Sequence, residues 1–279
     1  MKLQVIFNFY IIDNECNNAA YQIHYVWLSN IASMVDKMTF ILTYNSDIEI
    51  ETINRIKSIL VSICNVSDIT FITEPNNPEF REGIIYKKYI IDRLDQYDDY
   101  LTFFGHTKGV SNPNGFEDQN NLLLWIFSMY YLSFAYIIEM QTKLESNMHD
   151  YITYGGAYFN DFRHTNNYHW FYSGSLYWIN TKRLNEYIIK NNIDKYDYIT
   201  VGGERIKNCA ELYPGHIFPN KYAAFYMDEV FNKDFEPFND DGWEISYKHF
   251  DKFLQEYLQI DDYLELYNQF RNMLNKITE

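Results

Sequence analysis

The first 110 residues alternate short apolar segments with segments of helical periodicity, and this alternation limits the possible folds most strongly. Strands are predicted at residues 1–12, 38–46, 67–73 and 100–104. Helices are predicted between them, where apolar residues recur at intervals of three and four, at 18–36, 48–61 and 84–94. Strands that alternate with helices form a mainly parallel sheet with helices on both faces. We therefore expect an α/β fold.

In sheets of this kind, ligands bind at the carboxyl ends of the strands. Here those ends lie in the loops that follow Phe9, Tyr44, Thr73 and Phe104. The first strand ends in Asn8-Phe9-Tyr10, so neither the Gly-rich dinucleotide fingerprint nor a phosphate-binding P-loop follows it. The sequence thus predicts a nucleotide-type sheet without a standard nucleotide loop.

The second half of the chain continues with shorter elements. Strands are predicted at 151–158 and 170–179. Helices are predicted at 181–190, at 204–212 with Pro214–Gly215 ending it, and in a charged segment at 245–277. No internal repeat or low-complexity linker divides the chain. We expect one main domain at 1–244 and a helical appendage at 245–279.

The uncharged segment 122–138 has roughly the shortest length that spans a bilayer. It contains three Tyr and two Ser, and it lacks flanking Lys or Arg residues that would set an orientation. A helix buried in the core therefore explains this segment better than a membrane span does. The amino-terminal run is likewise predicted as a strand, not as a signal peptide.

Charge and cysteine content restrict the partners and the compartment. The chain has 23 Lys and Arg against 38 Asp and Glu, a net charge of −15, which would repel a polyanion such as DNA. An anionic ligand must therefore be held by a local cluster of donors. The three cysteines, Cys16, Cys64 and Cys209, fit neither a disulfide framework nor a zinc site. We expect a cytoplasmic protein with reduced, buried cysteines.

Three segments carry the candidate chemistry, and each also has a purely structural interpretation. The segment 103–112 places His106, Thr107 and Lys108 between Gly105 and Gly109 at the end of a strand, which suits a phosphate or a metal. The alternative is a plain turn with a surface lysine.

The second segment, 170–184, contains Ser173–Gly174 inside a strand rich in aromatic residues. A glycine in a strand marks close approach of a ligand or a backbone, and Trp170 and Tyr177 suit the apolar faces of sugar rings. The alternative is an ordinary aromatic core strand. In the third segment, 202–218, Glu204 and Glu211 lie seven residues apart, on one face of a helix, where a carboxylate can act as a general base. The alternative is a solvated helix face.

In their order, these segments resemble a family of GT-A-type glycosyltransferases of giant viruses, phages and bacteria, over roughly residues 1–220. Members carry an Arg/Glu/Gly element before a helix, a His-Thr-Lys-Gly or His-Asn-Lys-Gly turn, a Trp helix, a Ser-Gly-Asn-Phe-Trp-Trp strand and a Glu/Arg helix. The corresponding segments here are Arg81–Gly83, His106–Gly109, Trp125 with Tyr130–Tyr131, Ser173–Trp178, and Glu204–Arg205 with Glu211. Ser175 stands in place of the Asn and Tyr177 in place of the first Trp.

The resemblance implies a mainly parallel nucleotide-binding sheet with a smaller acceptor-side sheet. GT-A enzymes usually end the fourth strand in Asp-x-Asp, which binds Mn²⁺ or Mg²⁺ and the diphosphate. His106-Thr107-Lys108 stands near that position. The resemblance therefore implies His106 as a ligand of Mn²⁺ or Mg²⁺ and Lys108 as a substitute for the charge of a metal, and it leaves metal-independent transfer open.

The resemblance and the strand ends together give a set of candidate site residues. The donor and its phosphates are assigned to Asn8, Tyr10, Tyr44, Arg81, Lys87, His106, Thr107, Lys108 and Gly109. The acceptor and the sugar are assigned to Trp170, Ser173, Gly174 and Tyr177. The candidate bases are Glu211, Glu204 and Asp161, which are needed only if the configuration inverts.

The expected function is transfer of a sugar from a UDP- or GDP-sugar to a glycan or glycoprotein, in the host cytoplasm if the protein is viral. Two alternatives stay open. One is a non-catalytic protein that binds glycans or nucleotide sugars on the same fold. The other is a nucleotidyltransferase, which would be expected to carry a basic Gly-rich loop after the first strand, where this chain has Asn8–Cys16.

Overall fold

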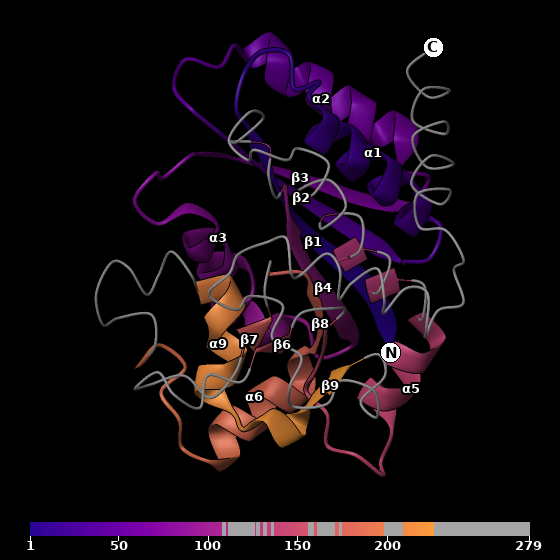
Figure 1. The fold of residues 1–279 in the computed structure, drawn as a ribbon, viewed down its shortest axis with the longest axis vertical. Helices are drawn as coiled ribbons and strands as arrows, with labels where there is room; N and C mark the ends of the chain where they lie inside the picture. Colours follow the sequence, from indigo (N-terminus) through magenta and orange to yellow (C-terminus); the bar gives the residue numbers. More distant parts are fainter. Residues whose placement is uncertain are drawn as a thin grey trace, which may run out of the picture.

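A computed structural model gives the fold of the chain (Figure 1). It describes residues 1–107, 110, 126, 129–130, 133–134, 137–155, 159–160, 171–172, 175–197 and 209–225. The strands among these residues are β1 (Lys2–Ile11), β2 (Lys37–Tyr44), β3 (Asp68–Pro75), β4 (Tyr100–His106), β5 (Thr153–Gly155), β6 (Phe159–Asn160), β7 (Phe171–Tyr172), β8 (Tyr177–Asn180) and β9 (Ala223–Phe225).

The helices among the described residues alternate with the first strands, as the periodicity predicts. They are α1 (Ala19–Ala32), α2 (Ile50–Ile63), α3 (Arg81–Tyr89), α5 (Ile137–Glu145), α6 (Thr181–Lys190) and α9 (Cys209–Ile217), with 3-10 turns η1 (Ile91–Gln96) and η2 (Asn220–Tyr222). The helix predicted at 84–94 is split, because the backbone bends at Ile90 and the chain continues as η1.

The main sheet has seven strands in the order β3-β2-β1-β4-β8-β5-β9. Strands β1 to β4 are parallel, β8 is antiparallel to both β4 and β5, and β9 is parallel to β5. Strands β6 and β7 form a separate antiparallel pair. The expected α/β architecture with a mostly parallel sheet flanked by helices is therefore confirmed.

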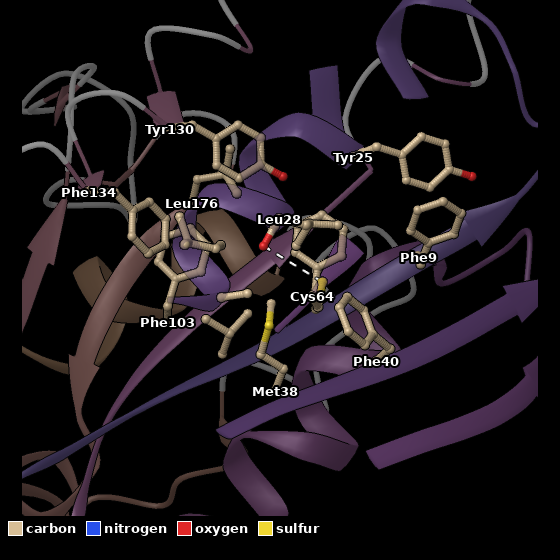
Figure 2. Packing of buried hydrophobic residues seen from close by; sticks show 14 of the residues in the cluster. Phe9, Tyr25, Leu28, Met38, Phe40, Cys64, Phe103, Tyr130, Phe134 and Leu176 are labelled. Atoms are coloured by element: carbon tan, nitrogen blue, oxygen red, sulfur yellow. Dashed lines mark hydrogen bonds between the residues drawn. The ribbon is translucent and has the colours of Figure 1, made fainter. Parts of the chain in front are cut away.

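Alternating residues of the central strands supply two cores, one on each face of the sheet. On one face, Val5, Phe7 and Phe9 of β1 pack with Phe40 of β2 and with helices α1 and α2. Figure 2 shows part of this core, in which the thiol of Cys64 lies 3.7 Å from the carbonyl oxygen of Leu28. Burial raises the pKa of the Cys64 thiol to about 12, so this thiol stays protonated, as expected for a small buried hydrophobe.

On the other face, Ile6 of β1 and Phe104 of β4 pack under α3, α6 and α9. Helices α3 and α9 contact each other, and they lie across the sheet from α1 and α2 (Figure 1). The two sets of helices close both faces, so a ligand approaches the sheet at its ends. In sheets of this kind, the end that binds ligands is the carboxyl end of the parallel strands.

Two predicted elements are wrong. The single strand predicted at 170–179 is two strands in two sheets, because β7 pairs with β6 whereas β8 lies between β4 and β5. The prediction that Pro214–Gly215 ends a helix is also wrong, since α9 continues to Ile217 with Pro214 inside it. Proline leaves the carbonyl four residues earlier, on Ala210, without its helical donor, and the hydroxyl of Tyr177 lies 2.7 Å from that oxygen.

Within the part of the chain that the structure describes, no helix is long and apolar enough to cross a membrane. The described residues of the segment 122–138 include five that are helical and almost completely buried, namely Ile126, Met129, Tyr130, Ser133 and Phe134. These five agree with the prediction of a core helix. The predicted appendage at 245–279 lies outside the described residues.

Candidate functional site

The carboxyl ends of four neighbouring parallel strands meet at one edge of the main sheet. Strands β3, β2, β1 and β4 are adjacent in this order and parallel, so they end together at this edge. Because β8 runs antiparallel to β4, β8 begins where β4 ends. We call this region the carboxyl edge, and most of the predicted donor residues lie on it.

Asn8 and His106 lie side by side on the carboxyl edge, as paired residues of β1 and β4. Both are buried, with 5% and 8% of their surfaces exposed. The hydroxyl of Thr43 on β2 donates a hydrogen bond of 2.9 Å to Asn8 Oδ1. This bond fixes the amide of Asn8, which leaves its Nδ2 group as the donor available to a ligand. The sequence analysis did not select Thr43, although Thr43 directly precedes Tyr44 at one of the predicted strand ends.

Thr107 extends the pairing of β1 and β4 beyond the last residue of β4. Its backbone N–H donates to the carbonyl of Asn8 at 3.0 Å, and its hydroxyl oxygen accepts from the backbone N–H of Tyr10 at 2.9 Å. The hydroxyl oxygen of Thr107 thus takes the place that its own backbone carbonyl would have in a continued parallel ladder. The hydroxyl keeps its own proton, so Thr107 can still donate to a ligand.

Three polar side chains from successive strand ends form what we call the amide–phenol cluster: Tyr10, Asn45 and Asn76. The hydroxyl of Tyr10 donates to Asn45 Oδ1 at 3.1 Å, and Asn76 Nδ2 donates to the same oxygen at 2.9 Å. All three side chains are half-buried. Sequence reasoning named Tyr10 only, and the signal that it missed is an Asn directly after β2 and another directly after β3.

The loop after β1 is fixed against α2. Asn14 Oδ1 accepts from the hydroxyl of Thr52 at 2.9 Å, and the guanidinium of Arg55 donates to the carbonyl of Glu15 at 3.0 Å. Asp13 Oδ1 accepts from the backbone N–H of Cys16 at 2.6 Å. Side-chain bonds of this kind hold an irregular loop in one conformation. The loop therefore forms a fixed border to the carboxyl edge.

Three residues near the carboxyl edge have a positive φ although they are not glycines. They are Cys16 at 51° after β1, Arg81 at 47° after β3 and Ser175 at 58° before β8, and a fourth, Asn192, follows α6. Such backbones cost energy, and they concentrate at functional sites. Their grouping supports a ligand site at this edge.

The predicted cations occupy different surroundings. Arg81 is exposed, and its backbone N–H donates to the carbonyl of Asn77 at 2.7 Å. Lys87 donates to both oxygens of Asp92, at 3.1 and 2.9 Å. Desolvation acts to raise the pKa of Asp92, but the bonds from Lys87 and Tyr196 outweigh it and hold that pKa below its usual value. Lys87 is thus engaged in tying α3 to η1.

Two tyrosines that the sequence analysis assigns to the site, Tyr44 and Tyr177, pack against the cores. Tyr44 is half-buried and packs against the core formed with α1 and α2. Tyr177 has no exposed surface, and its hydroxyl lies 2.7 Å from the carbonyl of Ala210 and 2.8 Å from the hydroxyl of Tyr86. Tyr177, which the sequence analysis assigns to the sugar, is thus placed in the core under α3 and α9. It joins β8, α3 and α9.

The remaining predicted residues divide into one that is placed and several that are not. Glu211 lies half-buried in the first turn of α9. The others lie outside the described residues: Lys108, Gly109, Asp161, Trp170, Ser173, Gly174 and Glu204.

The described residues do not form a site for Mn²⁺ or Mg²⁺. No group of three or more His, Cys, Asp or Glu side chains among them could hold a metal. His106 is accompanied on the carboxyl edge by the neutral side chains of Asn8 and Thr43, whereas these two ions prefer carboxylate-rich oxygen sites.

Comparisons with known proteins give no match, either to a family model, to a curated protein or to a solved structure.

Proposed function

We propose that this protein is a glycosyltransferase that uses a nucleotide-diphosphate sugar. The observation that carries the proposal is the set of hydrogen-bonding side chains from β1, β2, β3 and β4 on the carboxyl edge. The edge belongs to a mostly parallel sheet that lacks a Gly-rich loop after β1. A small second sheet, β6–β7, also agrees with the acceptor-side sheet that the family resemblance implies.

The amide–phenol cluster suits the nucleoside. A nucleobase offers a ring face and an edge with adjacent donor and acceptor groups. The internal bonds of the cluster use Asn45 Oδ1 and Asn76 Nδ2, so that Asn45 Nδ2 remains as a donor and Asn76 Oδ1 as an acceptor. The ring of Tyr10 supplies an aromatic face beside them. The cluster can therefore bind a base without any charged side chain.

The end of β4 suits the diphosphate. His106, Thr107 and, next in the sequence, Lys108 follow one another where β4 ends. When the diphosphate leaves, negative charge develops on it, and donors that are already in place stabilise that charge. In a chain with a net charge of −15, such donors have to be local.

In the proposed reaction, the hydroxyl oxygen of the acceptor forms a bond to the anomeric carbon of the sugar. The bond between that carbon and the diphosphate oxygen breaks, and the nucleoside diphosphate leaves with the electron pair. The hydroxyl proton passes to a carboxylate if the configuration inverts, and we assign this role to Glu211. Its helix, α9, contacts β7 of the small sheet.

A binding protein without catalytic activity is the second candidate. Lys87 is engaged by Asp92, so one expected source of positive charge for the leaving diphosphate is already paired within the protein. Such a protein would bind the nucleotide sugar and release it unchanged.

The test is thermal unfolding with a panel of nucleotide sugars and free nucleotides, each with Mn²⁺, Mg²⁺ or EDTA. A ligand at one hundred times its dissociation constant should stabilise the fold by about 2.7 kcal/mol. Any donor that stabilises the protein is then incubated with glycan acceptors, and the release of nucleoside diphosphate is measured. Stabilisation with release supports the transferase, stabilisation without hydrolysis or transfer supports the binding protein, and no stabilisation by any nucleotide contradicts both.

A further inference from the structure

Ser175 is a buried serine whose hydroxyl is not used by the fold. The residue has no exposed surface, and its Oγ has no hydrogen-bond partner in the structure. Leaving a buried hydroxyl without a partner costs free energy, and proteins retain few such groups without a reason. The other buried serine among the described residues, Ser133, differs, because its hydroxyl donates to the carbonyl of Met129 at 2.7 Å.

The position of Ser175 is set by the pairing of β4 and β8. Phe104 pairs with Tyr177, so continuing the antiparallel register by two residues brings Ser175 opposite His106. Packing supports this continuation, because a Cβ added to Gly105 would lie 2.8 Å from Cδ2 of Leu176. Since His106 itself pairs with Asn8, the residues Asn8, His106 and Ser175 then form one row that crosses β1 and β4 and ends just before β8.

The backbone of Ser175 gives a second, independent sign of function. Its φ of 58° lies in the left-handed region, which a serine adopts at a cost that glycine would avoid. With a serine at this position, the protein has both a strained backbone and a buried hydroxyl without a hydrogen-bond partner. Because a strained backbone costs free energy, a shift at Ser175 that lets a ligand reach the buried Oγ would also release this strain.

We infer that the hydroxyl of Ser175 is a specificity-determining donor to the diphosphate of the nucleotide, opposite His106 at the carboxyl edge. The inference rests on the proposed function, because it assumes a nucleotide at this edge. An oxygen of a diphosphate is an anionic acceptor. A hydrogen bond from a neutral hydroxyl to a charged acceptor is stronger than one between two neutral groups. A monophosphate does not extend as far along the row as a diphosphate does.

The test compares S175A with the wild type in two measurements, nucleotide affinity by calorimetry and thermal unfolding without ligand. S175A should weaken binding of UDP or GDP, whichever the wild type binds, by about ten- to one-hundred-fold, and should leave binding of the matching monophosphate unchanged. Its melting temperature should stay equal or rise, because the variant removes a hydroxyl that has no partner. A purely structural role predicts the opposite: a lower melting temperature with unchanged affinity.

S175G and S133A complete the design. S175G should melt at a higher temperature, because glycine relieves the positive φ, and it should lose the same affinity for the diphosphate as S175A. S133A, the matched control, removes a satisfied buried hydroxyl and should bind both nucleotides like the wild type. A wild type that binds no nucleotide overturns the proposed function and this inference together. A wild type that binds the diphosphate no better than S175A overturns only the inference.

Discussion

Single residues on the carboxyl edge differ in what their side chains bond, and Asn76 and Asn77 make the contrast clear. Within the part of the chain that the structure describes, the side chain of Asn76 bonds to Asn45 and, at 3.4 Å, to Tyr10, both in the amide–phenol cluster. The side chain of Asn77 accepts from the backbone N–H groups of Glu79 and Phe80 and so shapes the entry into α3. Neighbours in sequence thus provide a matched pair for substitution.

We expect N76A to weaken nucleotide binding by about tenfold while changing the stability little, because it removes a contact to the base. N77A should lower the stability by about 1 kcal/mol, because the N–H groups before α3 lose their acceptor, and should leave the affinity unchanged. Calorimetry and urea unfolding of the two variants measure both quantities. Equal affinity of N76A and the wild type would remove the cluster from the site.

At the scale of elements, a side chain of strand β8 supplies a hydrogen bond that Pro214 removes from helix α9. Proline cannot donate to the carbonyl of Ala210, and the hydroxyl of Tyr177, at 2.7 Å, does so instead. The bond links α9 to β8, two elements that are more than 30 residues apart in the sequence.

Y177F should therefore destabilise the protein by about 1–3 kcal/mol, since it leaves a buried carbonyl without a donor. In a P214A background the helix regains its own N–H donor at this position, so Y177F should cost less there. Urea unfolding of the four proteins gives the coupling between the two changes. Independent, additive effects would show that the Tyr177 hydroxyl does not replace the helical donor.

Side chains pack closely around Gly105 of β4. A Cβ at this position would lie 2.8 Å from Leu176, 2.9 Å from Phe103 and 3.0 Å from Phe7. The glycine thus allows close packing of side chains inside a strand, where the sequence suggested a turn or the approach of a ligand. It also belongs to β4 together with His106.

We expect G105A to destabilise the fold by about 1–3 kcal/mol through overpacking. The L176A substitution, which is destabilising alone, should cost less in the G105A background because it removes the nearest of these atoms. Thermal unfolding of the single and double variants measures this coupling. A G105A protein as stable as the wild type would mean that the neighbouring side chains move without cost.

At the scale of the whole molecule, the buried tyrosines link stability to alkaline pH. Burial raises the pKa of Tyr21, Tyr25 and Tyr130 above the usual value of about 10. The folded state thus favours the neutral phenol, and this contribution is fully present below the pKa of the unfolded chain. It is lost as the pH rises above about 10 toward the folded values.

Alkaline titration should therefore show these tyrosines ionising only when the protein unfolds. Absorbance near 295 nm, an ordinary wavelength for the phenolate, would follow ionisation, while far-ultraviolet circular dichroism follows unfolding. We expect a large part of the absorbance change to coincide with the loss of circular dichroism above about pH 10. Complete ionisation in the folded protein would contradict the burial of these rings.

Much of the first half of the fold could be predicted from the sequence, because the periodicity of apolar residues is a local property. Strands β1 to β4 and helices α1 and α2 lie within a few residues of their predicted bounds. The strand ends also predicted that Asn8, Tyr10, His106 and Thr107 lie at one edge. What the sequence determined by itself is thus the order of strands and helices and the edge of the sheet at which these polar side chains lie.

The tertiary structure decided everything that depends on residues far apart in the sequence. It brought Asn45 and Asn76 to Tyr10, placed β8 antiparallel beside β4, and buried Tyr177 under α9. No local pattern distinguishes an aromatic residue in a core from one in a site, or a proline that ends a helix from one whose missing bond is replaced. These outcomes depend on which distant groups remain available once the sheet has formed and its faces are covered.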